Sequence, residues 1–293
     1  MTVETIVPGV LTVASAVPDP PFEMERDGAL AGFDIALMQA LAAELGLTWR
    51  ACRYEGADFN GIFDGLESGA WDCVASGTTI TPEREAKVDF CAPYVISGQS
   101  LVCNVARHPT YRSVRDLGGQ VIAVQKGNTS QPVAERLKAQ GAVAEVRVYP
   151  YAGIGAMLDD LEAGRIAAIM KLAPVMRWLT RDRSHLEVVQ DDITVEKLGI
   201  CVRKGNAPLR EALDAAQARL AADGRLGALV TTWIKPRHAA FACSPGPTAA
   251  PTWRTSPCPS PSSRRLTPCI SRRAQRMPRS TGTPPRAGNT SSP

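Results

Sequence analysis

Apolar residues recur along most of the chain in two patterns that alternate with each other. Short β-favouring runs such as 9–14 and 71–75 predict buried strands. Longer segments repeat apolar positions three or four residues apart, as Ile35, Met38 and Leu41 do, which predicts helices with one buried face. Strands that alternate with helices in this way are typical of doubly wound sheets, so the pattern predicts an α/β fold.

The order of these elements divides the chain into two lobes. The larger lobe begins with a βαβαβ unit, whose strands are predicted at 9–14, 47–54 and 71–75 and whose helices are predicted at 35–45 and 59–68. The smaller lobe repeats the alternation, with strands at 120–124, 146–149 and 167–170 and helices at 129–140 and 153–163. The chain then returns to the larger lobe through a strand at 198–202 and helices at 208–222 and 224–234.

We therefore expect a discontinuous larger lobe of residues 1–97 and 198–236 and a smaller lobe of residues 98–197. The segment 94–104 is expected to be extended where the chain first changes lobes. Two crossings between the lobes make a hinge, which permits nearly rigid lobes to close around a ligand.

The stretch from Ser76 to Arg84 follows a predicted strand and has the features of an anion site. Thr81 is a good N-cap and Pro82 suits the first helical position, so a helix is expected to begin there. Backbone N–H groups at such a turn, together with hydroxyls such as that of Thr79, can hold carboxylate oxygens. Arg84 adds a planar fork that grips a carboxylate with two charge-assisted hydrogen bonds. The simpler alternative is a capped helix with a surface arginine.

Several short motifs, taken in order, resemble the family 3 solute-binding proteins of ABC transporters. They are Pro20-Pro21-Phe22-Glu23, Gly32-Phe33-Asp34-Ile35, the stretch from Ser76 to Tyr94, Val124 to Thr129, Leu161 to Arg165, Gly199 to Gly205, and Asp223-Gly224 with Trp233. The resemblance covers about residues 10 to 236. It implies a type II periplasmic binding protein fold, in which each lobe is a doubly wound sheet and two hinge crossings join the lobes.

The resemblance also implies which residues hold the ligand. The carboxylate-binding arginine of the family matches Arg84, and the residues beside it match Ser76, Gly77 and Thr79. The stacking aromatic matches Phe59, for which a plain core role is the alternative. The turn of the smaller lobe that closes on the carboxylate matches Gln125, Asn128 and Thr129.

In the family members that bind α-amino acids, two acidic residues usually pair with the ammonium of the ligand. By the resemblance, Ala16 and Leu172 occupy those two positions here, so both acids are missing. Leaving a buried ammonium without a counter-charge costs on the order of 3 to 5 kcal/mol, so a standard amino acid in the standard pose is not expected. Asp19 stands where an aromatic usually covers the ligand, and Lys171 adjoins the lost acid. Either Asp19 takes the ammonium in a shifted pose, or Lys171 and Arg84 together hold a second anionic group.

Charge is distributed unevenly along the chain. The net charge is +4, but residues 237–293 carry nine Arg and no Lys, Asp or Glu, which leaves −5 for residues 1–236. The 11 Pro and 9 Ser of that tail show no apolar periodicity, and such a segment is predicted to be disordered. We interpret it as non-native or frame-shifted coding rather than as a basic arm for a membrane or nucleic acid, and no nucleic-acid partner is expected.

Neither a metal nor a cofactor is predicted. The eight cysteines contain no Cys-x-x-Cys pair, and the three histidines are far apart in sequence. The five cysteines of residues 1–236 lie mostly in apolar surroundings, which favours buried free thiols.

The chain contains no apolar run of about 18 residues that would span a membrane. The N-terminal residues Met1 to Thr5 lack the basic start and apolar core of a secretory signal. The resemblance, however, implies a periplasmic or extracellular location. Either a signal has been removed or lost upstream of this start, or the protein stays inside, and we expect the first.

The predicted function is substrate binding for an ABC-type uptake system, without catalysis. A monomer would close on a small carboxylate-bearing polar metabolite, such as an amino-acid derivative, an opine-like compound or an organic acid, and deliver it to a membrane permease. One alternative is an enzyme similar to cyclohexadienyl dehydratase, with Lys171 or Asp19 as general acid or base. The other is the sensor domain of a receptor.

Overall fold

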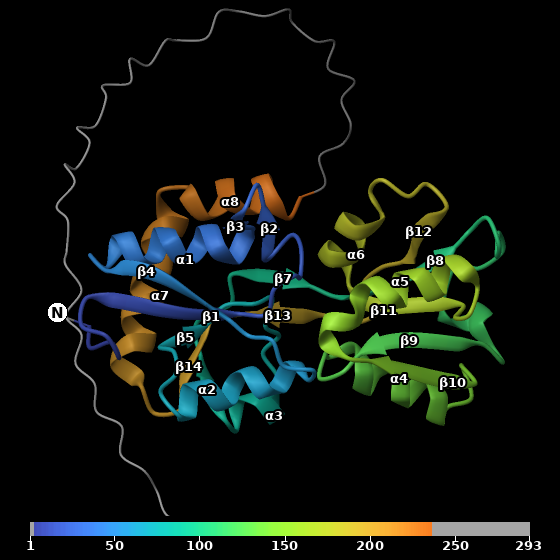
Figure 1. Ribbon diagram of the computed structural model, residues 1–293, viewed down its shortest axis with the longest axis horizontal. Helices are drawn as coiled ribbons and strands as arrows, with labels where there is room; N and C mark the ends of the chain where they lie inside the picture. The colour runs from blue at the N-terminus through green and yellow to red at the C-terminus, as the bar shows by residue number, and fades with distance from the viewer. Residues whose placement is uncertain (1–2, 236–293) are drawn as a thin grey trace, which may run out of the picture. The chain divides into compact units, whose positions relative to one another are not determined.

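The computed structural model describes residues 3–235 (Figure 1). The tail from Arg237 onward, which is predicted to be disordered and is interpreted as non-native coding, lies outside the described residues. No helix within the described range is long and apolar enough to cross a membrane.

The larger lobe is built on a five-stranded sheet with the order β4-β1-β5-β14-β6. Its strands are β1 (Val10–Ser15), β4 (Thr48–Arg53), β5 (Cys73–Val74), β6 (Val88–Phe90) and β14 (Cys201–Arg203). The first strand pairs in parallel with both β4 and β5, whereas β14 is antiparallel to its neighbours. Its helices are α1 (Phe33–Glu44), α2 (Asp64–Glu67), α3 (Pro82–Glu85), α7 (Ala207–Ala222), α8 (Arg225–Trp233) and the 3-10 helix η1 (Phe59–Phe63).

The smaller lobe repeats this plan with the strand order β10-β9-β11-β8-β12. Its strands are β8 (Gln99–Asn104), β9 (Val121–Gln125), β10 (Glu145–Tyr149), β11 (Ala168–Leu172) and β12 (Leu186–Gln190). Its helices are α4 (Ser130–Ala139), α5 (Ile154–Ala163), α6 (Ala173–Thr180) and the 3-10 helices η2 (Val114–Leu117) and η3 (Tyr151–Gly153). The two-lobe α/β architecture predicted from the sequence is confirmed.

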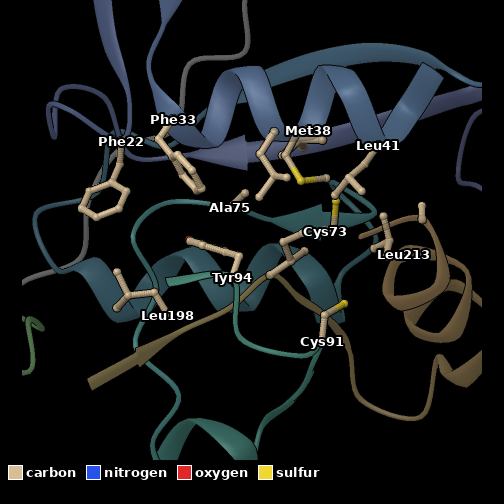
Figure 2. Packing of buried hydrophobic residues seen from close by; sticks show 14 of the residues in the cluster. Phe22, Phe33, Met38, Leu41, Cys73, Ala75, Cys91, Tyr94, Leu198 and Leu213 are labelled. Carbon is tan, nitrogen blue, oxygen red and sulfur yellow. The ribbon is translucent and has the colours of Figure 1, made fainter. Parts of the chain in front are cut away.

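Both sheets are covered by apolar side chains on both faces, as a doubly wound fold requires. In β1, Leu11 and Val13 point to the core beneath α1, whereas Ala14 points to the core around η1 and α2. Figure 2 shows the first of these cores, in which Leu41 of α1 lies over Cys73 and Phe33 lies over Tyr94. Four of the five cysteines in the described range are buried and all five are free thiols.

The chain crosses between the two sheets twice. The first crossing runs from β7 (Val95–Ser97) into β8, and the second runs from β12 into β13 (Glu196–Leu198). β7 and β13 pair with each other in antiparallel fashion and lie between the two sheets in Figure 1. This paired ribbon is the place where a hinge is expected, and the residue limits of the lobes stay a prediction.

Several local details differ from the sequence-based expectation. The segment 59–68 is a 3-10 helix followed by a single α turn, and the strand predicted at 71–75 is reduced to β5. The hairpin of β2 (Met24–Arg26) and β3 (Ala29–Ala31) was not predicted, although its Asp27-Gly28 turn is a typical hairpin signal. Both turn residues adopt positive φ, 52° and 76°, as that tight turn requires.

Candidate ligand-binding site

The turn after β5 carries most of the predicted residues of the larger lobe. Gly77 adopts a φ of 51°, and its N–H donates to the carboxylate of Asp34 at 2.6 Å. Thr81 caps α3, because its side chain accepts a hydrogen bond from the backbone N–H of Arg84 at 3.3 Å. The helix start predicted at Thr81 and Pro82 is therefore confirmed, and it fixes the helix that carries Arg84.

Arg84 is a buried cation that forms no salt bridge with a carboxylate among residues 3–235, and the nearby charge of Glu196 acts on it only through space. It is only 7% exposed, and its guanidinium donates to Thr79 O and Gly127 O, both at 3.0 Å, and to Asn60 Oδ1 at 3.3 Å. All of these acceptors are neutral oxygens. Burial lowers the pKa of Arg84 to about 10, so the group is still charged at neutral pH.

Aromatic rings of η1 line the other side of this guanidinium. The carbon at its centre lies 5.1 Å from the ring centroid of Phe59 and 5.4 Å from that of Phe63. Such cation–π contacts partly compensate for lost hydration. The ring of Phe59 also packs against that of Tyr151 from the smaller lobe, with 5.2 Å between the ring centroids. Phe59 is therefore both a packing residue and a residue of the cleft.

Lys171 and Asp19 form a buried ion pair. Lys171 Nζ lies 3.0 Å from Asp19 Oδ1, and the two side chains are 2% and 9% exposed. The ammonium also lies 5.6 Å from the ring centroid of Tyr151. Burial raises the pKa of Asp19, an effect that the charge of Lys171 opposes. Neither charge is free in this conformation, because each is the partner of the other.

Two more carboxyl groups are buried behind Asp19. Glu23 accepts a hydrogen bond from the Ser76 hydroxyl, and burial together with Asp34 raises its pKa well above the usual value. Burial raises the pKa of Asp34 to about 7, although its carboxylate accepts from Gly77 and from the Tyr94 hydroxyl at 3.2 Å. At neutral pH this part of the molecule therefore retains protons that free carboxyl groups would have lost.

Glu196, at the start of β13, ties the hinge to both lobes. It is 6% exposed, and its Oε2 accepts from the hydroxyls of Thr79 at 2.6 Å and Thr129 at 2.7 Å. Its Oε1 accepts from Gln99 Nε2 at 2.9 Å and from the Thr194 hydroxyl at 2.8 Å. The hydroxyl protons of Thr79 and Thr129 are therefore directed at Glu196 in this conformation.

These groups surround a small cavity between the two sheets. Its lining comprises Asp19, Phe59, Ser76, Gly77, Thr79, Arg84, Gln99, Asn128, Thr129, Tyr151 and Leu172. The free volume is about 20 Å³, which is roughly the space of one water molecule. Direct bonds close the site, including Phe59 N–H to Lys126 O at 3.2 Å and Tyr151 N–H to Ala57 O at 2.9 Å. A metabolite would enter only when these contacts separate.

Eight of the ten residues predicted to bind ligand line this cavity. The other two lie directly behind it. Gln125 donates from its amide to Tyr151 O and accepts from Asn128 at 3.5 Å, and Lys171 pairs with Asp19. Sequence reasoning missed Gln99, Tyr151 and Glu196, which carry no local motif and are brought to the site only by the fold.

The arrangement can hold an anion at Arg84 and can enclose it between two lobes. Within residues 3–235, no group of three or more His, Cys, Asp and Glu side chains is placed to hold a metal ion.

Comparison with known proteins places this geometry in a wider context. The model of the bacterial extracellular solute-binding proteins, family 3, matches residues 11–236. The chain is 31% identical to the putative ABC transporter arginine-binding protein 2 of Escherichia coli (strain K12) over 223 residues, 74% of this chain and 87% of that protein. It is 32% identical to the L-cystine-binding protein TcyJ of the same strain over 229 residues, 77% of this chain and 83% of that protein.

A solved structure extends the comparison to the fold. The crystal structure of an ancestral amino-acid-binding protein, described as a precursor of cyclohexadienyl dehydratase, aligns with a TM-score of 0.69 and 30% identity. The alignment covers 78% of this chain and 96% of that one.

Proposed function

The chain belongs to the bacterial extracellular solute-binding proteins of family 3, and we propose that it captures a small carboxylate-bearing polar metabolite for an ABC-type uptake system. Amino-acid derivatives, opine-like compounds and organic acids are the ligands that fit this description. The observation that carries the proposal is Arg84, a cation that is buried beside the cavity and forms no salt bridge within the described residues. A ligand carboxylate would supply the missing charge through charge-assisted hydrogen bonds.

The ion pair of Lys171 and Asp19 bears on the rest of the ligand. A carboxylate and an aromatic ring form the setting that an ammonium group prefers, and the ammonium of Lys171 already occupies that setting. The α-ammonium group of a ligand would have to compete with the ammonium of Lys171 for this setting. This favours ligands whose carboxylate has no adjacent ammonium, and it leaves Arg84 rather than Lys171 as the anion-binding cation.

Delivery to a permease requires that the ligand favour the closed form. A ligand shifts a conformational equilibrium only by contacts that differ between the two states. Arg84 belongs to the larger lobe and Asn128 and Thr129 belong to the smaller one, and all three line the cavity. A carboxylate between them bridges the lobes, so we infer that a monomeric closed form outside the cytoplasmic membrane presents the ligand to its permease.

The dehydratase-related neighbour makes an enzyme the second candidate. Lys171 and Asp19 are its possible acid and base, but their charges neutralise each other, and Lys171 does not line the cavity. A proton donor must reach its substrate directly or through one water. Binding without turnover is therefore the preferred function, and release of carboxylate products from prephenate-like acids would contradict it.

A thermal-shift screen of the full chain tests the proposal. The protein is unfolded and refolded during purification to remove any carried-over ligand, and it is then screened against amino acids, opines, dicarboxylates and hydroxycarboxylates. A ligand at a hundredfold excess over its dissociation constant adds about 2.7 kcal/mol of stability. We expect carboxylates to give this shift in the parent chain and to lose it in Arg84→Met. A shift that survives in Arg84→Met would place the anion site elsewhere.

A further inference from the structure

Gln99 occupies a wall of the cavity for which the proposed function gives no role. It is the first residue of β8, directly after the first crossing, and is 1% exposed. Its side chain lines the cavity. Its Oε1 is buried and has no hydrogen-bond partner within residues 3–235.

The orientation of this amide follows from its neighbours. Nε2 lies 2.9 Å from Glu196 Oε1 and 3.1 Å from the Thr129 hydroxyl oxygen. A carboxylate accepts hydrogen bonds and cannot donate them, so the amide must turn its N–H₂ toward Glu196. The carbonyl oxygen is consequently left without a partner, which is a costly state for a buried acceptor.

Glu196 imposes the same polarity on the hydroxyl groups beside it. A hydroxyl has one proton, and those of Thr79 and Thr129 both point to Glu196 Oε2. Thr79 therefore offers only lone pairs to the cavity. Because Glu196 takes up these donors, the groups of this wall can only accept hydrogen bonds from a ligand. The cation of the same cavity is Arg84.

We propose that Gln99 Oε1 accepts a hydrogen bond from an N–H or O–H group of the ligand, and that Glu196 is the positioning residue that keeps this oxygen turned toward the cavity. The inference rests on the proposed function and refines it. The ligand is a carboxylate that also carries a hydrogen-bond donor, and an analogue that lacks the donor leaves Gln99 unpaired in the closed form.

Matched probes test this refinement on the full chain by calorimetry. One set is butyrate with its 2-hydroxy, 3-hydroxy, 4-hydroxy and 2-amino derivatives, and the other is succinate with L-malate and L-aspartate. We expect a donor-bearing member to bind on the order of 10- to 100-fold more tightly than its parent acid. The position and type of the donor distinguish a hydroxyl from an amine ligand. Equal affinity within both sets would overturn the inference.

Three variants assign the discrimination to the two residues. Gln99→Met keeps the shape but removes the carbonyl, and Glu196→Gln frees the amide to turn. In both variants the ratio of the affinities for the donor-bearing member and for its parent acid is expected to fall to within about threefold. Gln217→Met is the matched control, because Gln217 is another buried glutamine with an unpartnered Oε1 but lies on α7 and does not line the cavity.

The outcomes separate the two proposals. A ratio that stays unchanged in Gln99→Met contradicts the role of Gln99. A complete absence of Arg84-dependent binding by any probe contradicts the carboxylate site itself, and with it this inference.

Discussion

The two buried cations at the cavity differ in how their charge is balanced. At the arginine end, Arg84 lies against Phe59 and donates only to neutral oxygens. At the lysine end, Lys171 forms an ion pair with Asp19 beside Tyr151. Removing a charge from water is costly unless a partner compensates. The lysine end is balanced by a salt bridge within the chain, whereas the arginine end has no salt bridge among the described residues, and we propose that a ligand carboxylate binds there.

The largest expected effect is the loss of ligand binding when Arg84 is replaced. Arg84→Met removes the charge and the planar fork, so carboxylate affinity should fall by about two to four decades, as expected for two charge-assisted hydrogen bonds. Calorimetric titration of the full chain measures this loss. Arg203→Met, which alters an exposed arginine on β14, is the control and should bind normally.

Replacing one partner at the lysine end should instead reduce stability. Lys171→Met leaves the Asp19 carboxylate buried without a counter-charge, which costs about 3 to 5 kcal/mol in the free energy of unfolding. The double variant Asp19→Asn, Lys171→Met should recover most of that loss. Urea unfolding of the single and double variants gives the coupling energy. Additive losses would mean that the two ends do not differ as described.

Proton uptake near the lysine end should make stability depend on pH. The pKa of Asp34 is raised to about 7, and that of Glu23 is raised as well. The folded state therefore holds protons that the unfolded state has released, so this stabilisation is lost as pH rises from about 4 through 7. Each unit of pKa shift corresponds to about 1.4 kcal/mol.

Urea unfolding at pH 5 and at pH 8 checks this dependence, and the protein should be more stable at pH 5. The groups that face Asp34 are the Gly77 amide, the Tyr94 hydroxyl and, at longer range, the carboxyl groups of Glu23 and Asp19. Asp34→Asn should reduce the difference between the two pH values. Stability that rises toward pH 8 would contradict the assignment.

The smallest effect is expected at the helix that carries Arg84. Thr81→Ala removes the side-chain cap of α3 and should cost about 1 kcal/mol in the free energy of unfolding, whereas Thr81→Ser should keep most of it. Thermal unfolding of both variants measures the loss. An equal loss in both would show that the cap hydroxyl is not responsible.

The arginine end was largely predictable from the sequence because its signals are local. A strand, a hydroxyl-rich turn, the N-cap Thr81 and Arg84 follow one another within a few residues, so backbone preferences suffice to order them. The α/β alternation likewise follows from the spacing of apolar residues.

The lysine end and the hinge were less predictable because they depend on contacts between distant segments. Asp19 and Lys171 were both singled out, but their pairing joins the loop after β1 to a strand of the other sheet. Nothing around Glu196 marks it as more than an ordinary strand residue. Three of its four hydrogen bonds exist only when β13 meets β8, the turn after β5 and the turn before α4.

The most direct test of the central claim compares a carboxylate with its carboxamide. The tightest-binding carboxylate from the screen and its primary amide are titrated into the full chain and into Arg84→Met. Because Arg84 has no salt-bridge partner within the described residues, we expect the parent chain to prefer the carboxylate by about a hundredfold or more and Arg84→Met to show almost no preference. If the parent chain binds the amide equally well, or if the preference survives in Arg84→Met, Arg84 is not the group that the ligand neutralises.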